Sequence, residues 1–558
     1  MRSRRLRLRW TVAAAAVLGG CIASAAAPPR AAVPDPAVRL VLVLTVDQMR
    51  PDYLERFGDQ FTGGLRYLLD HGRVYREAYQ DHAFTKTAAG HGTILSGLHP
   101  ARSGLIANDW YDRDKKKSVY CTDDPMDAAL GHSPRAFSGT MLGDWLREAS
   151  SASKVIALSR KDRSAVLLGG QNPTGVFWFE TAQGEFMTSR YYRKALPDWV
   201  RECNAGRRAD RYLGAVWDRL LPDAAAYRRS GPDDQDGEGD LGGRTFPHAF
   251  AGAKKPDAAF YNFLSNTPFM DELTLELAQK AVGAERLGQR GVTDLLALSL
   301  SSTDAVGHKF GPDSQEMQDM ILRLDRYLGD FFRFVDGAIG MRNVLVVLTA
   351  DHGTQSLPEV AARRGVWARR LVGEMANLLK GLEAELESKV GKGPWIVQNF
   401  FEGIYLDPDR IAASGRRPEE VERIAATFLR RSPIVADVFT RSELLKANPH
   451  QTPFTRQFVN AFHAKNSADL LMQLKVNHLV ISTPTGTDHG TPYPYDSHVP
   501  LVFAGPGVEV GVVRPRARTV DIAPTLADLL GIAAPSNLDG KSLRAKARPT
   551  APSAGVHR

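Results

Sequence analysis

Short runs of apolar residues recur along the chain, and most of them end at a polar or charged residue. They lack the polar alternation of a half-exposed sheet, so they predict strands buried on both faces of a mostly parallel sheet. The runs are RLVLVLTVD ending at Asp47, KVIALSRKDR from Lys154, DLLALSLSSTD ending at Asp304, NVLVVLTADHG with Asp351 and His352, HLVISTPTGTDHG, and VPLVFAGPG.

Segments with helical character separate these runs. We expect one helix to open at residues 90–96, a second over 139–149, and a long amphipathic helix over 314–338. The alternation predicts an α/β fold in which helices sandwich a mostly parallel central sheet. Ligands of such sheets bind beyond the carboxyl ends of the strands, so the side chains that follow the runs should gather at one edge. They are Asp47, Lys161, Arg163, Asp304, Asp351 and His352.

Two stretches, at about 170–270 and 360–480, interrupt the alternation, and we expect them to be insertions that cap the sheet edge. The first contains the letters GPDDQDGEGDLGG, which suggest a calcium loop. The spacing of its glycine and of a terminal glutamate does not fit an EF-hand, so we interpret it as a solvated loop.

The N-terminal residues 1–27 have the pattern of an export signal. Five arginines and no acidic residue precede a short apolar run, and three alanines at 25–27 offer a cleavage site. The letters LGGC ending at Cys21 also resemble a lipoprotein signal, in which this cysteine is lipidated and anchors the protein. Both interpretations stay open. Either one predicts a periplasmic or secreted protein, and the Ala/Pro/Arg-rich tail over 545–558 is expected to be disordered.

The composition is that of a globular protein, with 43% hydrophobic and 24% charged residues among 558. The net charge of +8 first suggests a nucleic-acid partner, but five of the basic residues lie in the export signal. Without them 66 basic residues face 63 acidic ones, so we expect no nucleic-acid binding. Three cysteines exclude a disulfide-built scaffold, and the sequence leaves open whether Cys121 and Cys203 pair.

Closely spaced aspartate and histidine residues follow several of the apolar runs. TDAVGH places Asp304 and His308 four residues apart, ADHG places Asp351 beside His352, and TDHG offers Asp488 and His489. Carboxylate and imidazole together are ligands for zinc, with manganese or iron as alternatives. With Asp47 they supply enough ligands for two metal ions, as in sites that act on phosphoryl groups.

The segment FTKTAAGHGTILSGLHPARSGLIANDWYD resembles the alkaline phosphatase superfamily, in particular its phosphate-irrepressible members with a threonine nucleophile. The resemblance extends over residues 38–540 and includes VPLVFAGPGV and VDIAPTLADLLGI. It implies that Thr87 attacks phosphorus and that Asn108, Lys161 and Arg163 bind the phosphoryl oxygens. It also implies two zinc sites, formed by Asp304, His308 and His489, and by Asp47, Asp351, His352 and the Thr87 oxygen.

The predicted function is a zinc-dependent phosphomonoesterase of broad specificity, acting on small phosphate monoesters through a phosphothreonine intermediate, with a monomeric chain. Lys161 and Arg163, two apart, should point the same way if the chain stays extended, and would stabilise a monoester dianion. His91 is expected to support the turn at Thr87 and not to bind metal. A phosphodiesterase or nucleotide pyrophosphatase of the same superfamily is the first alternative. A non-catalytic, exported zinc- or phosphate-binding protein is the second.

Overall fold

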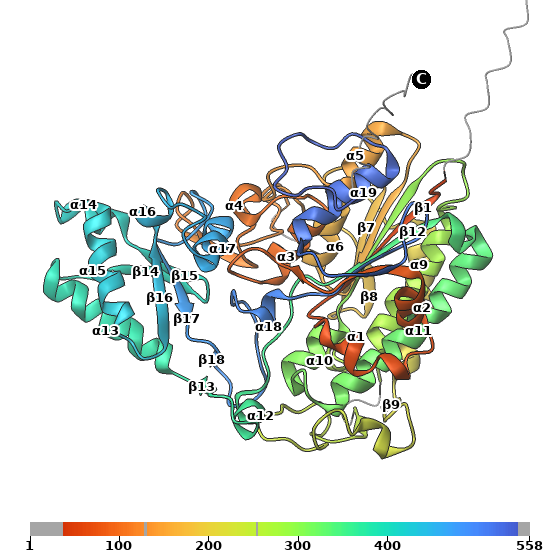
Figure 1. Cartoon of the computed structure of the whole chain (residues 1–558), viewed down its shortest axis with the longest axis horizontal. Helices are drawn as coiled ribbons and strands as arrows, with labels where there is room; N and C mark the ends of the chain where they lie inside the picture. Colours follow the sequence, from red (N-terminus) through yellow and green to blue (C-terminus); the bar gives the residue numbers. More distant parts are fainter. Residues whose placement is uncertain (1–36, 128–130, 251, 253–254, 545–558) are drawn as a thin grey trace, which may run out of the picture. The chain divides into compact units, whose positions relative to one another are not determined.

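The centre of the molecule is a nine-stranded sheet with the strand order β20-β2-β19-β12-β1-β11-β6-β7-β8 (Figure 1). It belongs to a computed structural model that describes residues 37–127, 131–250, 252 and 255–544. The predicted export signal with Cys21 and the tail over 545–558 lie outside the described residues. Contacts divide the chain after Asp35, so all described residues belong to the second unit.

Four of the predicted strands lie next to one another in the parallel middle of this sheet. β1 pairs in parallel with β11 on one side and with β12 on the other, and β6 and β7 continue the parallel order beyond β11. All seven residues of β1 are buried, as a strand covered on both faces requires. The bounds are β1 (Leu40–Val46), β6 (Val155–Ser159), β7 (Gly175–Glu180), β11 (Asp294–Leu300) and β12 (Val344–Thr349).

Antiparallel strands complete the sheet on both sides, and one predicted strand is not part of it. The run VPLVFAGPG forms β19 (Leu501–Ala504), which is antiparallel to β12 and to β2 (Gly72–Tyr75). β20 (Gly511–Val513) and β8 (Glu185–Met187) are the edge strands. The run HLVISTPTGTDHG instead forms the three-residue β18 (His478–Val480), paired with β13 (Arg369–Leu371) outside the central sheet. The apolar stretch of this run is too short for a central strand, and Pro484, four residues after the end of β18, cannot donate a hydrogen bond to a neighbouring strand.

Helices cover both faces of the sheet, which confirms the predicted α/β class. Leu40, Leu42 and Leu44 of β1 pack into one core, while Val41 and Val43 pack into the other. The first core includes residues of α2 (Gly64–His71), α9 (Phe269–Ala284), α10 (Ser302–Phe310) and α11 (Gln315–Ile339). The second includes residues of α3 (Thr87–Ile94), α5 (Leu142–Ala149), α6 (Asp162–Gly169) and α19 (Ile522–Leu530).

The three predicted helices exist with small differences in their bounds. The first, α3, begins at Thr87, three residues before the predicted start. Lys86, the residue before it, is still extended. The second, α5, starts at Leu142. The third, α11, ends at Ile339 and is capped by Ser314, whose hydroxyl accepts a hydrogen bond from the Met317 amide.

The stretch over 360–480 forms a small sheet of its own with a separate core. Its strand order is β14-β15-β17-β16, and α13 and α15 pack on it. The bounds are β14 (Ile396–Phe400), β15 (Gly403–Leu406), β16 (Val435–Thr440), β17 (Leu470–Leu474), α13 (Glu374–Lys389), α14 (Pro408–Ala413), α15 (Pro418–Arg430), α16 (Arg441–Leu444) and α17 (Pro453–Ala461). The stretch at 170–270 differs from expectation, because its first part supplies β7 and β8 to the central sheet.

The remaining part of that first stretch packs more tightly than a solvated loop would. Within GPDDQDGEGDLGG, Gln235 and Glu238 are 2% and 1% exposed, and Glu238 accepts hydrogen bonds from the Gln235 side chain and backbone. Burial, with help from Glu316, raises the pKa of Glu238 to about 8. Our expectation of a solvated loop was therefore wrong at these two residues, although others in the segment are exposed.

Two further observations concern the cysteines and the length of the apolar helices. Cys121 and Cys203 are both buried free thiols and lie in different cores, so they do not form a disulfide. Among the described residues, no helix combines the length and the apolar character that crossing a bilayer requires.

Candidate metal centre and phosphoryl site

Six predicted ligand residues come together at the carboxyl edge of the central sheet, in two groups of three. Within each group the potential ligand atoms all lie within 4.8 Å of one another. Asp47 follows β1, Asp351 and His352 follow β12, and these three form the first group. Asp304 and His308 are carried by α10, and His489 lies in the loop before α18 (Pro494–Ser497). The division into groups is the one that the family resemblance implied.

The first group is fully buried and contains polar atoms without a protein partner. Asp47 Oδ1 and His352 Nε2 lie 3.5 Å apart, and His352 Nε2 lies 3.3 Å from Asp351 Oδ2. Neither Asp47 Oδ1 nor His352 Nε2 has a hydrogen-bond partner among the described residues. Unsatisfied polar atoms are costly in a protein interior, so their convergence fits a cation between them.

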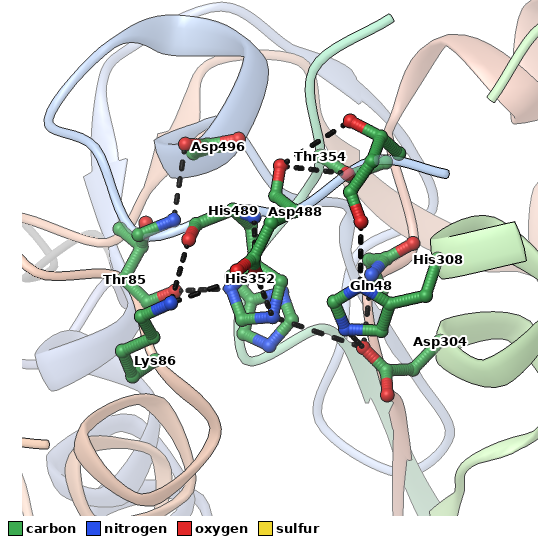
Figure 2. A network of polar contacts seen from close by, with 12 residues as sticks. Gln48, Thr85, Lys86, Asp304, His308, His352, Thr354, Asp488, His489 and Asp496 are labelled. Atoms are coloured by element: carbon green, nitrogen blue, oxygen red, sulfur yellow. Dashed lines mark hydrogen bonds and ion pairs between the residues drawn. The ribbon is translucent and has the colours of Figure 1, made fainter. Parts of the chain in front are cut away.

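The three histidines share one orientation that suits metal binding. In each ring Nδ1 lies within hydrogen-bond distance of a backbone carbonyl oxygen: that of Gly353 for His352 at 3.0 Å, and that of Thr487 for His308 at 2.8 Å. For His489 it is that of Thr85 at 2.7 Å (Figure 2). Donation from Nδ1 fixes the tautomer and leaves the Nε2 lone pair free as a ligand. All three Nε2 atoms face carboxylates of the two groups.

The protonation tendencies of several of the buried groups also favour ligation. Burial lowers the pKa of His352 to about 4 and holds that of His489 well below its usual range, so both rings stay neutral. Burial raises the pKa of Asp304, but Lys161 and His308 outweigh it and hold the carboxyl ionised. Burial would lower the pKa of His308, yet the adjacent Asp304 raises it to about 9. His352 and His489 are therefore neutral imidazoles and Asp304 is a carboxylate, the donor forms that zinc prefers, whereas the raised pKa values of Asp47, caused by burial, and of His308 favour their protonated forms.

Lys161 connects the two groups. Its ammonium nitrogen donates to Asp47 Oδ2 at 2.5 Å and to Asp304 Oδ2 at 2.7 Å, and the side chain is almost fully buried. One fixed positive charge thus lies between a carboxylate of the first group and a carboxylate of the second.

Gln48 makes a second connection that the sequence analysis missed. Its side-chain amide donates to Asp304 Oδ1 at 2.9 Å (Figure 2). Its backbone N–H donates to Asp351 Oδ1 at 3.1 Å. A left-handed φ of 67° turns the residue so that both contacts are possible. Its position directly after Asp47 was the one signal in the sequence that could have identified it.

Thr87 is the first residue of α3 and is buried, and its neighbours in the chain contact both groups. The preceding residues fix it there, because Thr85 accepts the His489 Nδ1 hydrogen bond and Lys86 donates to the His489 carbonyl oxygen at 2.8 Å. His91, one turn further on, has its Nδ1 2.9 Å from the Thr87 carbonyl oxygen and 3.1 Å from Asp351 Oδ2. These contacts fit the supporting role expected for His91.

Asn108 and Arg163 are the other two residues that were expected to bind the phosphoryl oxygens together with Lys161. Asn108 Oδ1 accepts a hydrogen bond from the Ala88 amide at 3.0 Å, which leaves the side-chain NH₂ group as a donor beside Thr87. Arg163 donates to the Tyr120 hydroxyl at 3.3 Å. It contacts neither of the two carboxylates that Lys161 contacts, those of Asp47 and Asp304. The extended chain on which the expected common direction of Lys161 and Arg163 depended is absent, because α6 begins at Asp162 between them, although both residues line one cavity.

Comparisons with known proteins extend these observations to nearly the whole chain. The profile of the type I phosphodiesterase / nucleotide pyrophosphatase family matches residues 41–496. The chain is 36% identical over 525 residues to alkaline phosphatase PafA of Elizabethkingia meningoseptica, covering 92% of this chain and 94% of that protein. It is 35% identical to alkaline phosphatase PhoV of Synechococcus elongatus, covering 90% and 92%. The crystal structure of wild-type PafA superposes with a TM-score of 0.84 over 92% of this chain and 99% of that one.

Proposed function

Because this chain belongs to the type I phosphodiesterase / nucleotide pyrophosphatase family of the alkaline phosphatase superfamily, we propose that it is an alkaline phosphatase. Full-length relatives that carry this activity in their names support the assignment. The reaction we propose is zinc-dependent hydrolysis of small phosphate monoesters with broad specificity. The observation that carries the proposal is the Lys161 ammonium held between Asp47 and Asp304.

Two divalent cations, zinc in our proposal, would be held by the two groups of three ligands. Bound there, they would supply Lewis-acid chemistry at the attacking and leaving oxygens. The partnerless atoms Asp47 Oδ1 and His352 Nε2 and the shared orientation of the histidine rings support this assignment. The oxygen of Thr87 would complete the first site.

Thr87 is proposed as the nucleophile. Its hydroxyl oxygen would attack phosphorus, the ester oxygen would leave, and the resulting phosphothreonine would be hydrolysed by water to release phosphate. The N-terminus of α3 favours negative charge at this position, since its first backbone N–H groups point outward along the helix axis. The Asn108 NH₂ group, oriented by its contact with Ala88, would donate to a phosphoryl oxygen.

The charge near the two groups favours a monoester over a diester. A monoester dianion carries one more negative charge than a diester, and this charge is placed on the non-bridging oxygens. Lys161 and Arg163 would stabilise this additional negative charge in the transition state. They would do so effectively because the protein already holds both side chains in place. Lys161 is fixed by Asp47 and Asp304, and Arg163 by Tyr120.

Phosphodiester or nucleotide pyrophosphate hydrolysis is the second candidate, and the description of the matching family profile favours it. The decisive experiment compares the kcat/KM values for an aryl monoester and the matched diester in the wild type and in Lys161→Ala. We expect the wild type to prefer the monoester and Lys161→Ala to reduce this preference at least tenfold, the effect of about 1.4 kcal/mol.

A matched control is Lys280→Ala, which removes an exposed lysine of α9. This variant should keep the wild-type preference. Faster diester hydrolysis by the wild type, or an unchanged preference in Lys161→Ala, would transfer the assignment to the diesterase. An exported zinc- or phosphate-binding protein without turnover is the remaining alternative. It would be excluded by aryl phosphate hydrolysis that is lost in Thr87→Ala and after chelation.

We also propose that the protein is exported to the periplasm or secreted and acts as a monomer that scavenges phosphate. The arginine-rich start and the apolar run before Cys21 support export. Cell fractionation of the full chain and of Cys21→Ala distinguishes the two export routes. Release of only the variant from membranes indicates a lipid anchor at Cys21, whereas identical soluble fractions indicate cleavage after the alanines.

A further inference from the structure

Arg160 is a charged residue beside the phosphoryl site that the proposed mechanism does not use. It directly follows β6 and precedes Lys161, and it lines an open cavity of about 340 Å³ together with Lys161 and Arg163. Its guanidinium forms no hydrogen bond and no ion pair with any residue that the structure describes, and its Nε atom is buried. Arg160 is thus a cation next to the site without a protein partner in contact.

The surroundings of Arg160 make this lack of a partner unfavourable. Burial lowers the pKa of Arg160, while Asp304, Asp47 and Asp271 counteract this from beyond ion-pair distance. A partly buried charge without a contact partner destabilises a protein, because the lost hydration is not replaced. The arrangement is favourable when an anion of the substrate supplies the missing contact.

The acidic residues that line the same cavity do not supply this contact. Asp162 accepts hydrogen bonds from the hydroxyl groups of Tyr120 and Thr122 and is thereby satisfied. Glu180 accepts only the backbone amide of Ala182, at 3.4 Å, and forms no ion pair with Arg160. The cavity therefore offers the guanidinium of Arg160 without a contacting acidic side chain, next to Arg163 and to Lys161, which Asp47 and Asp304 hold.

The position of Arg160 also indicates which part of a substrate it would meet. Among the charged groups that act on it, Asp304 has the largest effect, and Asp304 belongs to the second group of ligands. The cavity continues from Arg160 along Trp178, Phe179 and Thr181, and its volume suits a small organic group. Arg160 and these residues therefore line a space beside Lys161 that could hold part of a leaving group.

We propose that Arg160 forms a second anion subsite, which binds a carboxylate or phosphate carried by the leaving group of the substrate. This inference rests on the proposed phosphatase function and specifies its substrate class: monoesters whose leaving group is itself anionic, such as phosphoglycerates and sugar bisphosphates. Arginine suits such a subsite because its planar guanidinium can bind a carboxylate or phosphate through two parallel hydrogen bonds.

The test compares substrates that differ only in the second anion: 3-phosphoglycerate with glycerol 3-phosphate, and fructose 1,6-bisphosphate with fructose 6-phosphate. In Arg160→Gln the kcat/KM ratio of the substrate with the anionic leaving group to its partner should fall about tenfold, as expected for a lost hydrogen bond to a charged group. Arg160→Lys should restore part of the ratio. Arg326→Gln, an exposed arginine of α11, is the matched control and should keep it.

Three results would overturn the proposal. The first is an unchanged ratio in Arg160→Gln. The second is an equal weakening of inhibition by free inorganic phosphate, since this would place Arg160 at the phosphoryl group itself. The third is a wild-type ratio that does not fall with rising ionic strength, because salt screens the attraction between an open subsite and an anion. This last measurement decides the question even if Arg160→Gln does not fold.

A binding measurement separates this inference from the proposed function. Calorimetric titration of Thr87→Ala with 3-phosphoglycerate and with glycerol 3-phosphate requires no turnover. A binding preference for 3-phosphoglycerate that is lost in Thr87→Ala/Arg160→Gln supports the subsite, even if the wild type hydrolyses neither compound. Equal dissociation constants in both backgrounds exclude the subsite, even if the wild type is an active phosphatase.

Discussion

Gly90 of α3 lies against the backbone of Asp351 with no space for a side chain. A Cβ atom at position 90 would be 2.2 Å from the Asp351 carbonyl oxygen and 2.7 Å from the Asp351 Cβ. The helix that carries Thr87 is therefore in direct contact with the strand end that carries two predicted metal ligands. This contact sets the distance between Thr87, the proposed nucleophile, and the first group of ligands.

Gly90→Ala is expected to reduce both phosphatase activity and stability. The added methyl group must push α3 away from Asp351, and a displacement of about 1 Å can lower the rate about 100-fold. Overpacking of this kind also destabilises by about 1–3 kcal/mol. Steady-state kinetics and thermal unfolding measure the two effects.

Gly337→Ala is the matched control, since a Cβ there meets nothing within 4 Å on α11. It should leave activity unchanged and stabilise by about 0.4–1 kcal/mol, because alanine restricts the unfolded chain more than glycine. Equal activity of Gly90→Ala and Gly337→Ala would show that the contact with Asp351 does not position Thr87.

Gln48→Asn should weaken metal binding without straining the backbone. Asparagine tolerates the left-handed conformation at this position but is too short to reach Asp304 as Gln48 does. Loss of a hydrogen bond that orients a ligand lowers metal affinity about 10–100-fold. Competition with a chromophoric chelator measures the affinity, and Gln289→Asn, remote from the metal ligands in a loop after α9, should match the wild type. Identical affinities in both variants would argue against an orienting role for Gln48.

Removal of the metal should lower the melting temperature of the protein, and the decrease should be larger in Lys161→Ala than in the wild type. The carboxylates of Asp47, Asp304 and Asp351 would then face one another with Lys161 as their neutralising partner. A ligand at about 1,000 times its dissociation constant stabilises the native state by about 4 kcal/mol. Thermal unfolding with chelator, and after re-addition of zinc, should show a reversible decrease. A chelator-insensitive melting temperature would contradict occupancy of these groups by metal.

The buried Glu238 should make stability depend on pH in the opposite direction from an ion-paired carboxylate. Burial raises its pKa from 4.5 to about 8 in the folded chain, so the unfolded state releases its proton first as the pH rises. The contribution of Glu238 to stability is therefore complete below about pH 4.5 and decreases until about pH 8.

Glu238→Gln cannot ionise, so its free energy of unfolding should rise relative to the wild type across this range. The gain is at most about 1.4 kcal/mol for each pH unit. Chemical denaturation at several pH values measures it. Glu202→Gln, an exposed control on α7 (Asp198–Ala205), should run parallel to the wild type. Parallel curves for Glu238→Gln as well would mean that this carboxyl ionises normally in the folded protein.

Local patterns of the sequence predicted much of the fold because burial on both faces leaves a continuous signal. β1, β11 and β12 follow directly from their apolar runs, and the ligands Asp47 and Asp351 come at or just after the strand ends. The same reasoning failed for β18, where only three residues formed a peripheral strand, and for Arg163, where a helix began one residue earlier. At both positions the stretch of residues was too short for its pattern to show which conformation the chain adopts.

By itself the sequence determined the kind of fold and the chemistry of the candidate ligands, because strand burial and donor type are properties of residues and their neighbours. Only the tertiary structure decided which side chains contact one another. Lys161 meets Asp47 across 114 residues, and Gln48 meets Asp351 across 303. Such contacts depend on the order of strands in the sheet, which local periodicity does not encode. For the same reason Arg160 became recognisable as a charge without a partner only once every residue around it had a position.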